Sequence, residues 1–320
     1  MSRVLVTGAT GFIGRGLCGS LAQAGLNVRA ALRAVASPVD GVTDAFVVGD
    51  IGPTTDWASA LRGVDAVIHA AGRAHLLAGD ARQASAYYQT NTLGTRCLVS
   101  AAARAGVQRF IYLSSVKVNG EATDARPFSA QDVPQPRDAY AISKWQGEQQ
   151  ALEAARPSPM QLVVVRLPLV YGPGVRANFL RLLRWVDRGW PLPLGAVHNA
   201  RSLVSLWNLS DLLLRLLEHR AAAGTWMVSD GADLSTPQLL REMGHALGKP
   251  VRLLTVPLPL LRAAARLSGR APEVARLCGS LTVDVAATCA ALDWKPPISV
   301  QESLTRTAAW YRSGHVSGHA

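Results

Sequence analysis

Cysteine is scarce in this sequence, with only four residues in a chain of 320. They lie far apart, at Cys18, Cys97, Cys278 and Cys289. No pair has the close spacing of a zinc site, and scattered thiols are typical of the reduced interior of a cytosolic protein. We therefore predict free thiols and no metal site.

Long apolar stretches are also missing. No run approaches the roughly 20 residues of a membrane span, and Met1 lies too close to the first expected strand for a signal peptide. We therefore expect a cytoplasmic protein without membrane insertion. Apolar residues make up 49% of the chain, enough for a substantial core, and the length predicts about two domains.

Acidic residues are few, with 22 Asp and Glu against 33 Lys and Arg and a formal charge of +11. Such a charge is compatible with nucleic acid, an anionic membrane surface or small anionic ligands. The arginines are dispersed, without a run of like charge or a basic stripe interleaved with aromatic residues, so a nucleic-acid partner is disfavoured. We expect most of them on solvated helix faces and a few at phosphate groups.

The stretch of residues 3–17 places glycines between a β-branched, apolar segment and a segment whose apolar residues recur at helical spacing. Gly8 would make a tight turn, Gly11 would let a pyrophosphate approach bare backbone, and Gly14 would let the helix pack closely on the strand. The stretch therefore predicts a dinucleotide site.

The first turn of this helix would supply the anion contacts. Its free backbone N–H groups, at Phe12 and Ile13, would face the pyrophosphate. The spacing Gly-x-x-Gly-x-x-Gly differs from the Gly-x-Gly-x-x-Gly of the common fingerprint. The alternative is a simple tight connection, which three glycines in register so near the N-terminus disfavour.

Strands and helices alternate over residues 1–168, which predicts a Rossmann-type, doubly wound α/β fold with a parallel sheet and right-handed crossovers. Expected strands are 3–7, 27–32, 45–48, 65–71, 108–115 and 161–167, and expected helices are 12–24, 80–105 and 138–155. We predict that residues 1–168 form an NAD(P)-binding domain.

The pattern loosens beyond Pro168, where we expect a smaller substrate-binding lobe at residues 169–320. Its expected helices are 178–187, 208–219, 236–247 and 299–311. Residues 203–230 are expected to return to the main sheet, with a strand at 225–229.

Tyr140 and Lys144 lie one turn apart on the same face of the helix expected at residues 138–155. A tyrosine with its ordinary pKa near 10 is a poor acid-base catalyst at neutral pH, so a nearby ammonium and a positively charged nicotinamide would have to lower that pKa. Tyr140 would then protonate a ketone, and Lys144 would also reach the nicotinamide ribose. The alternative is an exposed helix face, because such a pair is common by chance.

Ser114 and Ser115 end the strand before this helix, at the edge where open α/β sheets bind ligands. With them, the chain resembles the extended short-chain dehydrogenases/reductases of the NAD-dependent epimerase/dehydratase family. The spacing between the family's catalytic serine and tyrosine selects Ser115 and leaves Ser114 in a packing or backbone-bonding role. The resemblance thus implies a catalytic triad of Ser115, Tyr140 and Lys144.

Weaker marks of the same family occur in the expected order along the chain. They are Asp50 and Ile51 at the adenine, Ala70 and Ala71 beside the cofactor, and Asn91 in the following helix. Each has an alternative interpretation, since Asp50 could cap a turn and Asn91 could bond a backbone carbonyl.

The choice of cofactor depends on a missing acid. An acidic residue about 20 positions past the glycines would hold the 2′-hydroxyl of the adenosine ribose, but residues 31–33 read Ala-Leu-Arg. Arg33 could instead pair with a 2′-phosphate. We therefore favour NADP(H), with NAD(H) as the alternative if Arg33 is simply solvated.

The resemblance also implies a nucleotide-sugar substrate and a homodimer. Arg201 and Arg276 match the arginines that clamp the diphosphate, and Asn178 follows a Tyr-Gly-Pro-Gly turn at the matching place. Lys117 would add a contact to the sugar. The dimer of the family packs the Tyr-x-x-x-Lys helix and the long helix before it against their mates.

The reaction type follows from residues 114–120, Ser-Ser-Val-Lys-Val-Asn-Gly. Sugar 4,6-dehydratases have an acidic pair where Val116 and Lys117 stand, so dehydration is disfavoured. This stretch and residues 199–204 resemble bacterial 4-reductases that convert a UDP-2-acetamido-2,6-dideoxy-4-hexulose for surface polysaccharide (O-antigen) synthesis. We predict NADPH-dependent reduction of the C4 ketone. A UDP-hexose or UDP-N-acetylhexosamine 4-epimerase with bound NAD is the alternative, and a non-catalytic regulator is a third interpretation that the intact triad disfavours.

Overall fold

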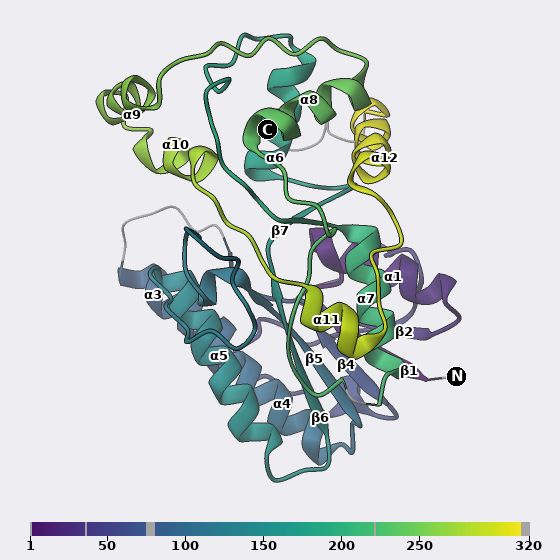
Figure 1. The fold of residues 1–320 in the computed structure, drawn as a ribbon. Helices are drawn as coiled ribbons and strands as arrows, with labels where there is room; N and C mark the ends of the chain where they lie inside the picture. Colours follow the sequence, from purple (N-terminus) through teal and green to yellow (C-terminus); the bar gives the residue numbers. More distant parts are fainter. Residues whose placement is uncertain (1, 36, 75–80, 221, 315–320) are drawn as a thin grey trace.

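The structure, a computed structural model, describes residues 2–35, 37–74, 81–220 and 222–314. Its centre is a seven-stranded sheet of order β3-β2-β1-β4-β5-β6-β9 in which all neighbours are parallel (Figure 1). The strands are β1 (Arg3–Thr7), β2 (Asn27–Leu32), β3 (Val42–Val47), β4 (Ala66–His69), β5 (Arg109–Ser115), β6 (Gln161–Leu167) and β9 (Gly224–Met227). The predicted doubly wound α/β fold is confirmed.

Helices cover both faces of the sheet because alternate side chains of a strand point to opposite faces. These helices are α1 (Phe12–Gln23), α2 (Ala58–Leu61), α4 (Thr95–Arg104), α5 (Ala139–Ala155) and α7 (Leu206–Glu218). In β1, Val4 and Val6 share a core with α1 and α7, whereas Leu5 shares another with α2, α4 and α5.

A smaller lobe lies above the sheet in Figure 1. It contains β7 (Leu169–Tyr171), β8 (Leu203–Ser205), α6 (Ala177–Asp187), α8 (Thr236–Leu247), α9 (Leu258–Leu267), α10 (Ala271–Cys278) and α12 (Val300–Arg312). Strands β7 and β8 pair in parallel, and α6, α8 and α12 enclose a separate apolar core. The chain returns to the main sheet at β9, beside β6, as predicted. The domain boundary at residue 168 stays a prediction.

One long helix expected at residues 80–105 is divided. It consists of α3 (Ala81–Tyr87), the π-helical segment η1 (Tyr88–Gly94) and α4, and Asp80 lies outside the described residues. The carbonyl of Asn91 accepts hydrogen bonds from the hydroxyls of Thr95, at 2.7 Å, and Tyr112, at 3.3 Å. Such π-helical turns occur frequently at functional sites.

Several short elements were not predicted from the sequence. They are α2, β7, β8, α9, α10, α11 (Ala286–Leu292) and the 3₁₀ turn η2 (Val116–Val118). Among the described residues, none of the helices has the length and apolar character required to cross a bilayer.

Candidate active site

The glycine turn between β1 and α1 leaves no room for a side chain. Gly8 has a φ of +70°, and a Cβ there would lie 2.8 Å from the backbone nitrogen of Ala71. A Cβ at Gly14 would lie 2.1 Å from the carbonyl oxygen of Gly8. Helix α1 has Gly11 as its N-cap, with no side-chain cap and no acid in the first turn. The N–H groups of that turn, including those of Phe12 and Ile13, therefore suit the phosphates of a dinucleotide.

A buried hydrogen-bond network holds the ends of β1 and β4 together. The Thr7 hydroxyl lies 2.7 Å from Nδ1 of His69 and accepts a hydrogen bond of 3.1 Å from the backbone N–H of Ala71. The other ring nitrogen of His69 lies 3.1 Å from the Thr95 hydroxyl. Burial, together with the charge of Lys144, lowers the pKa of His69 to about 3, so this ring is neutral. The network fixes Ala70 and Ala71 beside the glycine turn.

The expected adenosine end of the site pairs an arginine with an acid. The Arg33 guanidinium, at the end of β2, lies 3.7 Å from the Asp50 carboxylate, and both side chains are exposed. Ile51 packs against Gly94, where a Cβ would approach its Cγ2 to 2.7 Å. Asp50, in the loop after β3, is thus the acid that pairs with Arg33, and the cofactor contacts of Arg33, Asp50 and Ile51 stay predictions.

Ser115, Tyr140 and Lys144 converge where β5 ends and α5 begins. The Ser115 hydroxyl is near enough to that of Tyr140 to oppose the rise of its pKa. The Lys144 ammonium donates a hydrogen bond of 2.7 Å to the carbonyl of Leu113 and lies 4.0 Å from the centre of the Tyr112 ring. The structure therefore brings together the three residues of the predicted triad, whose catalytic roles stay predictions.

The pKa values at this site are dominated by burial. Burial raises the pKa of Tyr140 to about 12, although the Ser115 hydroxyl opposes the shift. Burial also lowers the pKa of Lys144 to about 7, against the opposing effect of the Glu148 carboxylate. The expected lowering of the pKa of Tyr140 by Lys144 together with a positively charged nicotinamide stays a prediction, because these shifts involve protein groups only. At neutral pH Tyr140 is a proton donor, and Lys144 is close to titration.

The two neighbouring serines face different surroundings. Ser115 is at the site with Tyr140, and its hydroxyl also accepts a hydrogen bond of 3.2 Å from the backbone N–H of Lys117. The Ser114 hydroxyl instead donates to the Glu148 carboxylate inside the protein. Alternating directions along β5 separate the two side chains, as expected for a strand.

A buried ion pair beneath the site was missed in the sequence analysis. Arg166 of β6 donates to both carboxylate oxygens of Glu148, at 2.7 and 3.1 Å, and to the side-chain oxygen of Asn119, at 3.1 Å. The side chains of Arg166 and Glu148 are 4% and 5% exposed. Two features of the sequence indicate this pair. Arg166 is a charged residue inside a largely apolar strand, and Glu148 is an acid one helical turn after Lys144.

The side chain of Asn91 forms hydrogen bonds with other protein groups. Its amide nitrogen donates to the carbonyl of Arg73 and to the Ser143 hydroxyl, both at 3.0 Å, and its oxygen accepts from the Arg73 N–H at 2.8 Å. The residue is buried. Asn91 therefore ties the loop after β4 to α5, which is the alternative role considered for it, and a direct cofactor contact stays a prediction.

Lys117 holds the start of α5. Its ammonium pairs with Asp138 and lies 3.5 Å from Glu121. Asp138 caps α5 by accepting a hydrogen bond of 2.7 Å from the N–H of Ala141. Burial favours the protonated form of Asp138, but the bonds from Lys117 and Ala141 outweigh this and lower its pKa. A sugar contact by Lys117 would therefore compete with this pairing.

Two of the three predicted diphosphate contacts lie close together. Arg201 donates to the carbonyls of Arg276, at 2.7 Å, and Gly279, at 3.0 Å. The positive charge of Arg276 acts on Asp138, which places α10 close to the start of α5. Asn178, on α6, accepts a hydrogen bond of 2.9 Å from Arg181. Arg201 thus stabilises the segment that carries Arg276, and the nucleotide contacts of all three residues stay predictions.

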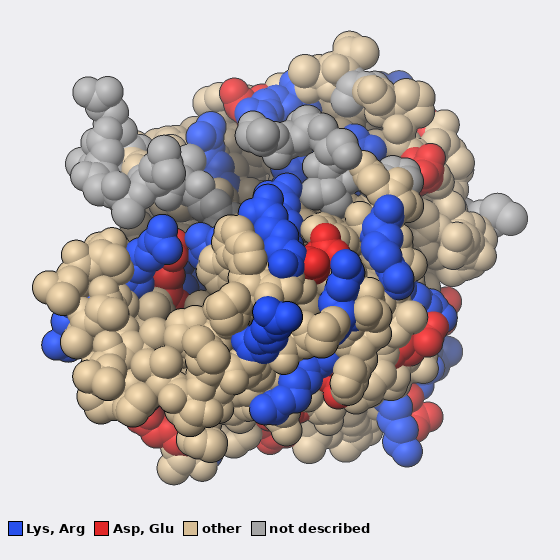
Figure 2. Space-filling model, turned by 90° about the horizontal axis from the view of Figure 1, so that it is seen from above, with Lys and Arg blue, Asp and Glu red and all other residues tan. Residues whose placement is uncertain are grey.

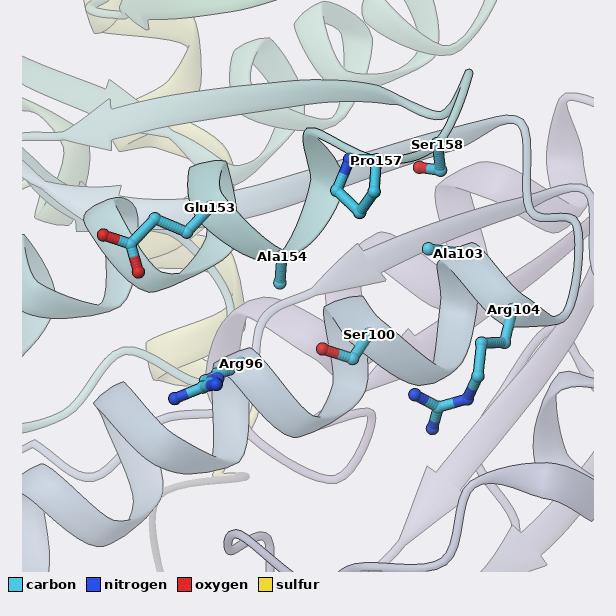
Figure 3. A pocket seen from close by; sticks show the side chains of 8 residues that line it. All are labelled: Arg96, Ser100, Ala103, Arg104, Glu153, Ala154, Pro157 and Ser158. Carbon is cyan, nitrogen blue, oxygen red and sulfur yellow. The ribbon is translucent and has the colours of Figure 1, made fainter.

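Two further hollows lie elsewhere on the described surface. A pocket of about 430 Å³ lies between α4 and the C-terminal end of α5 (Figure 3). A second, of about 600 Å³, lies in the smaller lobe beside the start of α8. Neither is lined by Ser115, Tyr140 or Lys144. Within the described ranges the four cysteines are free, and no cluster of metal-binding side chains is found.

Residues 4–228 match the NAD dependent epimerase/dehydratase family. Together with the parallel sheet, the glycine turn and the Ser-Tyr-Lys site, this match shows that the chain belongs to that family. It is therefore an NAD-dependent enzyme of the extended short-chain dehydrogenase type.

The relatives of this chain include both epimerases and reductases. The UDP-glucose 4-epimerase of Vibrio cholerae is 42% identical over 310 residues, which cover 95% of this chain and 94% of the relative. The GDP-6-deoxy-D-mannose reductase of Pseudomonas aeruginosa is 29% identical, covering 94% of each chain. The structure of MoeE5 in complex with UDP-glucuronic acid and NAD matches the fold with a TM-score of 0.79 at 24% identity, covering 98% of this chain and all of the other.

Proposed function

We propose that this protein is an NAD-dependent UDP-sugar 4-epimerase. The observation that carries the proposal is its 42% identity, along almost its whole length, to the UDP-glucose 4-epimerase of Vibrio cholerae. The arrangement of Ser115, Tyr140 and Lys144 supports it, because epimerisation at C4 needs proton transfer at the sugar 4-oxygen. The reductase favoured from the sequence becomes the second candidate.

The glycine turn suits a dinucleotide, and a nicotinamide bound there would supply the acceptor and donor of the C4 hydride. Tyr140 moves the proton of the sugar 4-hydroxyl, and Ser115 hydrogen-bonds the same oxygen. Lys144 is held by the carbonyl of Leu113 within reach of the tyrosine and the ribose. Because burial keeps the pKa of Tyr140 near 12, this residue needs additional positive charge to act as a base at neutral pH.

Two observations favour the second candidate, reduction of the C4 ketone of a UDP-4-keto-6-deoxy-N-acetylhexosamine for O-antigen synthesis. Tyr140 is protonated at neutral pH, which is the form that a ketone reduction uses. Arg33 at the end of β2 is compatible with the 2′-phosphate of NADPH. In the proposed epimerase, by contrast, Asp50 offsets the charge of Arg33 and NAD is the cofactor, as it is in MoeE5.

The substrate is proposed to lie between the sheet and the smaller lobe. Arg201 donates a hydrogen bond to the backbone carbonyl of Arg276, and the charge of Arg276 acts on Asp138 at the start of α5. Both arginines carry positive charge that would attract the diphosphate of a UDP-sugar. Lys117 and Asn178 would act nearer the sugar.

We also propose a homodimer through the outer faces of α4 and α5. Figure 3 shows the two helices side by side, with a shallow pocket between them. Its lining combines small and charged residues, namely Arg96, Ser100, Ala103, Arg104, Glu153, Ala154, Pro157 and Ser158. On α5, Ile142 and Leu152 are 41% and 50% exposed. Apolar side chains beside small ones would let the helices of a second copy pack closely.

The reaction can be tested directly with two parallel incubations. Purified protein is mixed with UDP-glucose or UDP-N-acetylglucosamine, without added cofactor, and the products are resolved by NMR. A second incubation contains a UDP-4-keto-6-deoxy-N-acetylhexosamine with excess NADPH, followed at the nicotinamide absorbance. Formation of the C4 epimer supports the epimerase. Stoichiometric loss of NADPH with no epimer overturns it and supports the reductase, and no reaction in either overturns both.

A further inference from the structure

Helix α9 has an apolar face that points away from the protein. Its inward side consists of Ala265, which is buried, and of Leu258 and Leu261, which pack on the core of the smaller lobe. On the outward side, Leu260 is 62% exposed and Leu267 is 92% exposed. Figure 1 shows α9 projecting at the edge of the smaller lobe, with α10 below it.

The outward side forms a continuous stripe. Exposed Ala263 and Ala264 lie between Leu260 and Leu267, which gives apolar residues at positions i, i+3, i+4 and i+7 of one helical face. In a monomeric soluble protein single exposed leucines are common, but a stripe of this spacing indicates an interaction surface. Helix α9 therefore has two apolar faces, one packed on the core of the smaller lobe and one exposed.

Positive charge lies along one flank of the stripe. Arg262 and Arg266 are one turn apart and exposed, and neither forms an ion pair with any residue that the structure describes. The surrounding sequence from residue 243 to 272 has no Asp or Glu. Its basic residues are Lys249, Arg252, Arg262, Arg266 and Arg270. On the face of the molecule seen in Figure 2, Lys and Arg side chains cover more of the surface than Asp and Glu side chains.

We propose that α9 docks the protein on an anionic membrane surface. Leucines on one side and arginines on the flank are the combination by which short helices lie in the headgroup region, with apolar side chains inserted and cations at the phosphates. An apolar groove on another protein would bury the leucines, but it would offer no anionic groups to the unpaired arginines or to the acid-free surface around them. Charge complementarity therefore selects the anionic lipid surface as the occupant.

The docking face adjoins the candidate active site through α10. Helices α9 and α10 are consecutive and pack together, and the end of α10 carries Arg276, whose carbonyl accepts the hydrogen bond from Arg201. Docking would hold the smaller lobe, including Arg276, at the membrane. The proposal goes beyond the proposed reaction and does not depend on it, because vesicle binding is measured without turnover.

The test is co-sedimentation of the full-length protein with lipid vesicles. Vesicles of phosphatidylcholine with about one third phosphatidylglycerol are compared with pure phosphatidylcholine, at low and at high salt. We expect binding to the anionic vesicles that weakens with salt. Arg262→Gln with Arg266→Gln should weaken it about 25-fold, from about 5-fold per charge, and Leu260→Ser with Leu267→Ser at least about 10-fold.

Matched controls separate docking from general effects. Arg62→Gln with Arg156→Gln removes two exposed charges from the sheet domain, and Val133→Ser changes a side chain that is 78% exposed elsewhere. These variants should lose at most the small effect of net charge, and circular dichroism should show every variant folded. Absence of vesicle binding overturns the proposal, as does equal binding by the α9 variants and the controls. Self-association that depends on Leu260 and Leu267 without vesicle binding would identify a contact between copies instead.

Discussion

Arg166 holds the carboxylate of Glu148 through two hydrogen bonds inside the protein, one helical turn beyond Lys144. The Ser114 hydroxyl donates to the same carboxylate, so its oxygens are well satisfied. The negative charge raises the pKa of Lys144 against the larger, opposite effect of burial. The ion pair thus connects the end of β5, the helix α5 and the candidate catalytic lysine.

Replacing this buried acid should be costly. In Glu148→Gln, Arg166 would remain charged without a counterion, and loss of one partner of a buried pair costs about 3–5 kcal/mol of unfolding free energy. Urea denaturation gives the value. Glu153→Gln, an exposed change on the same helix, should stay within about 0.5 kcal/mol of the original. A loss below about 1 kcal/mol in Glu148→Gln would show that the pair does not stabilise the fold.

Tyr140→Phe should lose turnover and keep the cofactor. Removing a positioned acid-base group lowers kcat by about 10²- to 10⁴-fold, whereas the glycine turn is untouched, so fluorescence titration should give the same NAD affinity. Ser115→Ala should reduce kcat as well. Ser114→Ala is the matched control, since its hydroxyl points to Glu148. Full activity of Tyr140→Phe, or a harmless Ser115→Ala beside an inactive Ser114→Ala, would contradict the assignment.

Arg33→Ala should discriminate between the two cofactors. If the guanidinium contacts a 2′-phosphate, its removal weakens NADPH by about 1.5–3 kcal/mol and leaves NADH nearly unchanged, because NADH lacks that group. Asp50→Asn should act oppositely, since it removes the negative charge 3.7 Å from Arg33. Dissociation constants from calorimetry decide the matter. Equal weakening of NADPH and NADH by Arg33→Ala would leave this residue without a role in cofactor choice.

His69 should make the protein sensitive to acid. Its pKa is 6.5 ordinarily and about 3 in the folded protein, so between these pH values the unfolded state binds more protons. Stability therefore falls as pH decreases through this window, by about 1.4 kcal/mol per pH unit for one proton. Urea denaturation from pH 6 to pH 5 should approach this slope in the original protein and lose it in His69→Gln. The same slope in both would assign the sensitivity to other groups.

The proposed dimer can be tested at one exposed leucine. Leu152→Glu places charge on the outer face of α5, where a partner helix would have to bury it, so the variant should sediment as a monomer at concentrations where the original is a dimer. Val133→Glu, at a side chain that is 78% exposed, is the control and should not change the mass. A dimer that survives Leu152→Glu would place the interface elsewhere.

The main sheet was predictable because its strands are buried and bounded by turns. Residues 3–7 and 161–167 were assigned with the bounds that the structure gives, because both are largely apolar runs that end at a glycine or a proline. The placement of Tyr140 and Lys144 on one helix face was predictable because a helix fixes their one-turn spacing. The strand end offered both Ser114 and Ser115, and the choice of Ser115 came from the family resemblance and not from local sequence.

Other features depend on contacts that a sequence does not display. Strands β7 and β8 are three residues each and exist because they pair across the chain. The role of Asn91 depends on Ser143, 52 residues away, and that of Arg201 on carbonyls near residue 276. The pKa of Tyr140 depends on burial, which only the fold determines and which raises it to about 12.

The glycines of α1 differ in how much room each leaves for a side chain. A Cβ at Gly14 would collide with backbone, one at Gly16 would meet the movable side chain of Leu206 at 3.0 Å, and one at Gly19 would meet nothing within 4 Å. Gly19 can therefore be replaced by alanine without a clash, and alanine there would favour the helix by about 1 kcal/mol. Gly14 has no such latitude. Gly8 and Gly14 are therefore required by the close packing of β1 and α1 itself, whether or not a dinucleotide is bound.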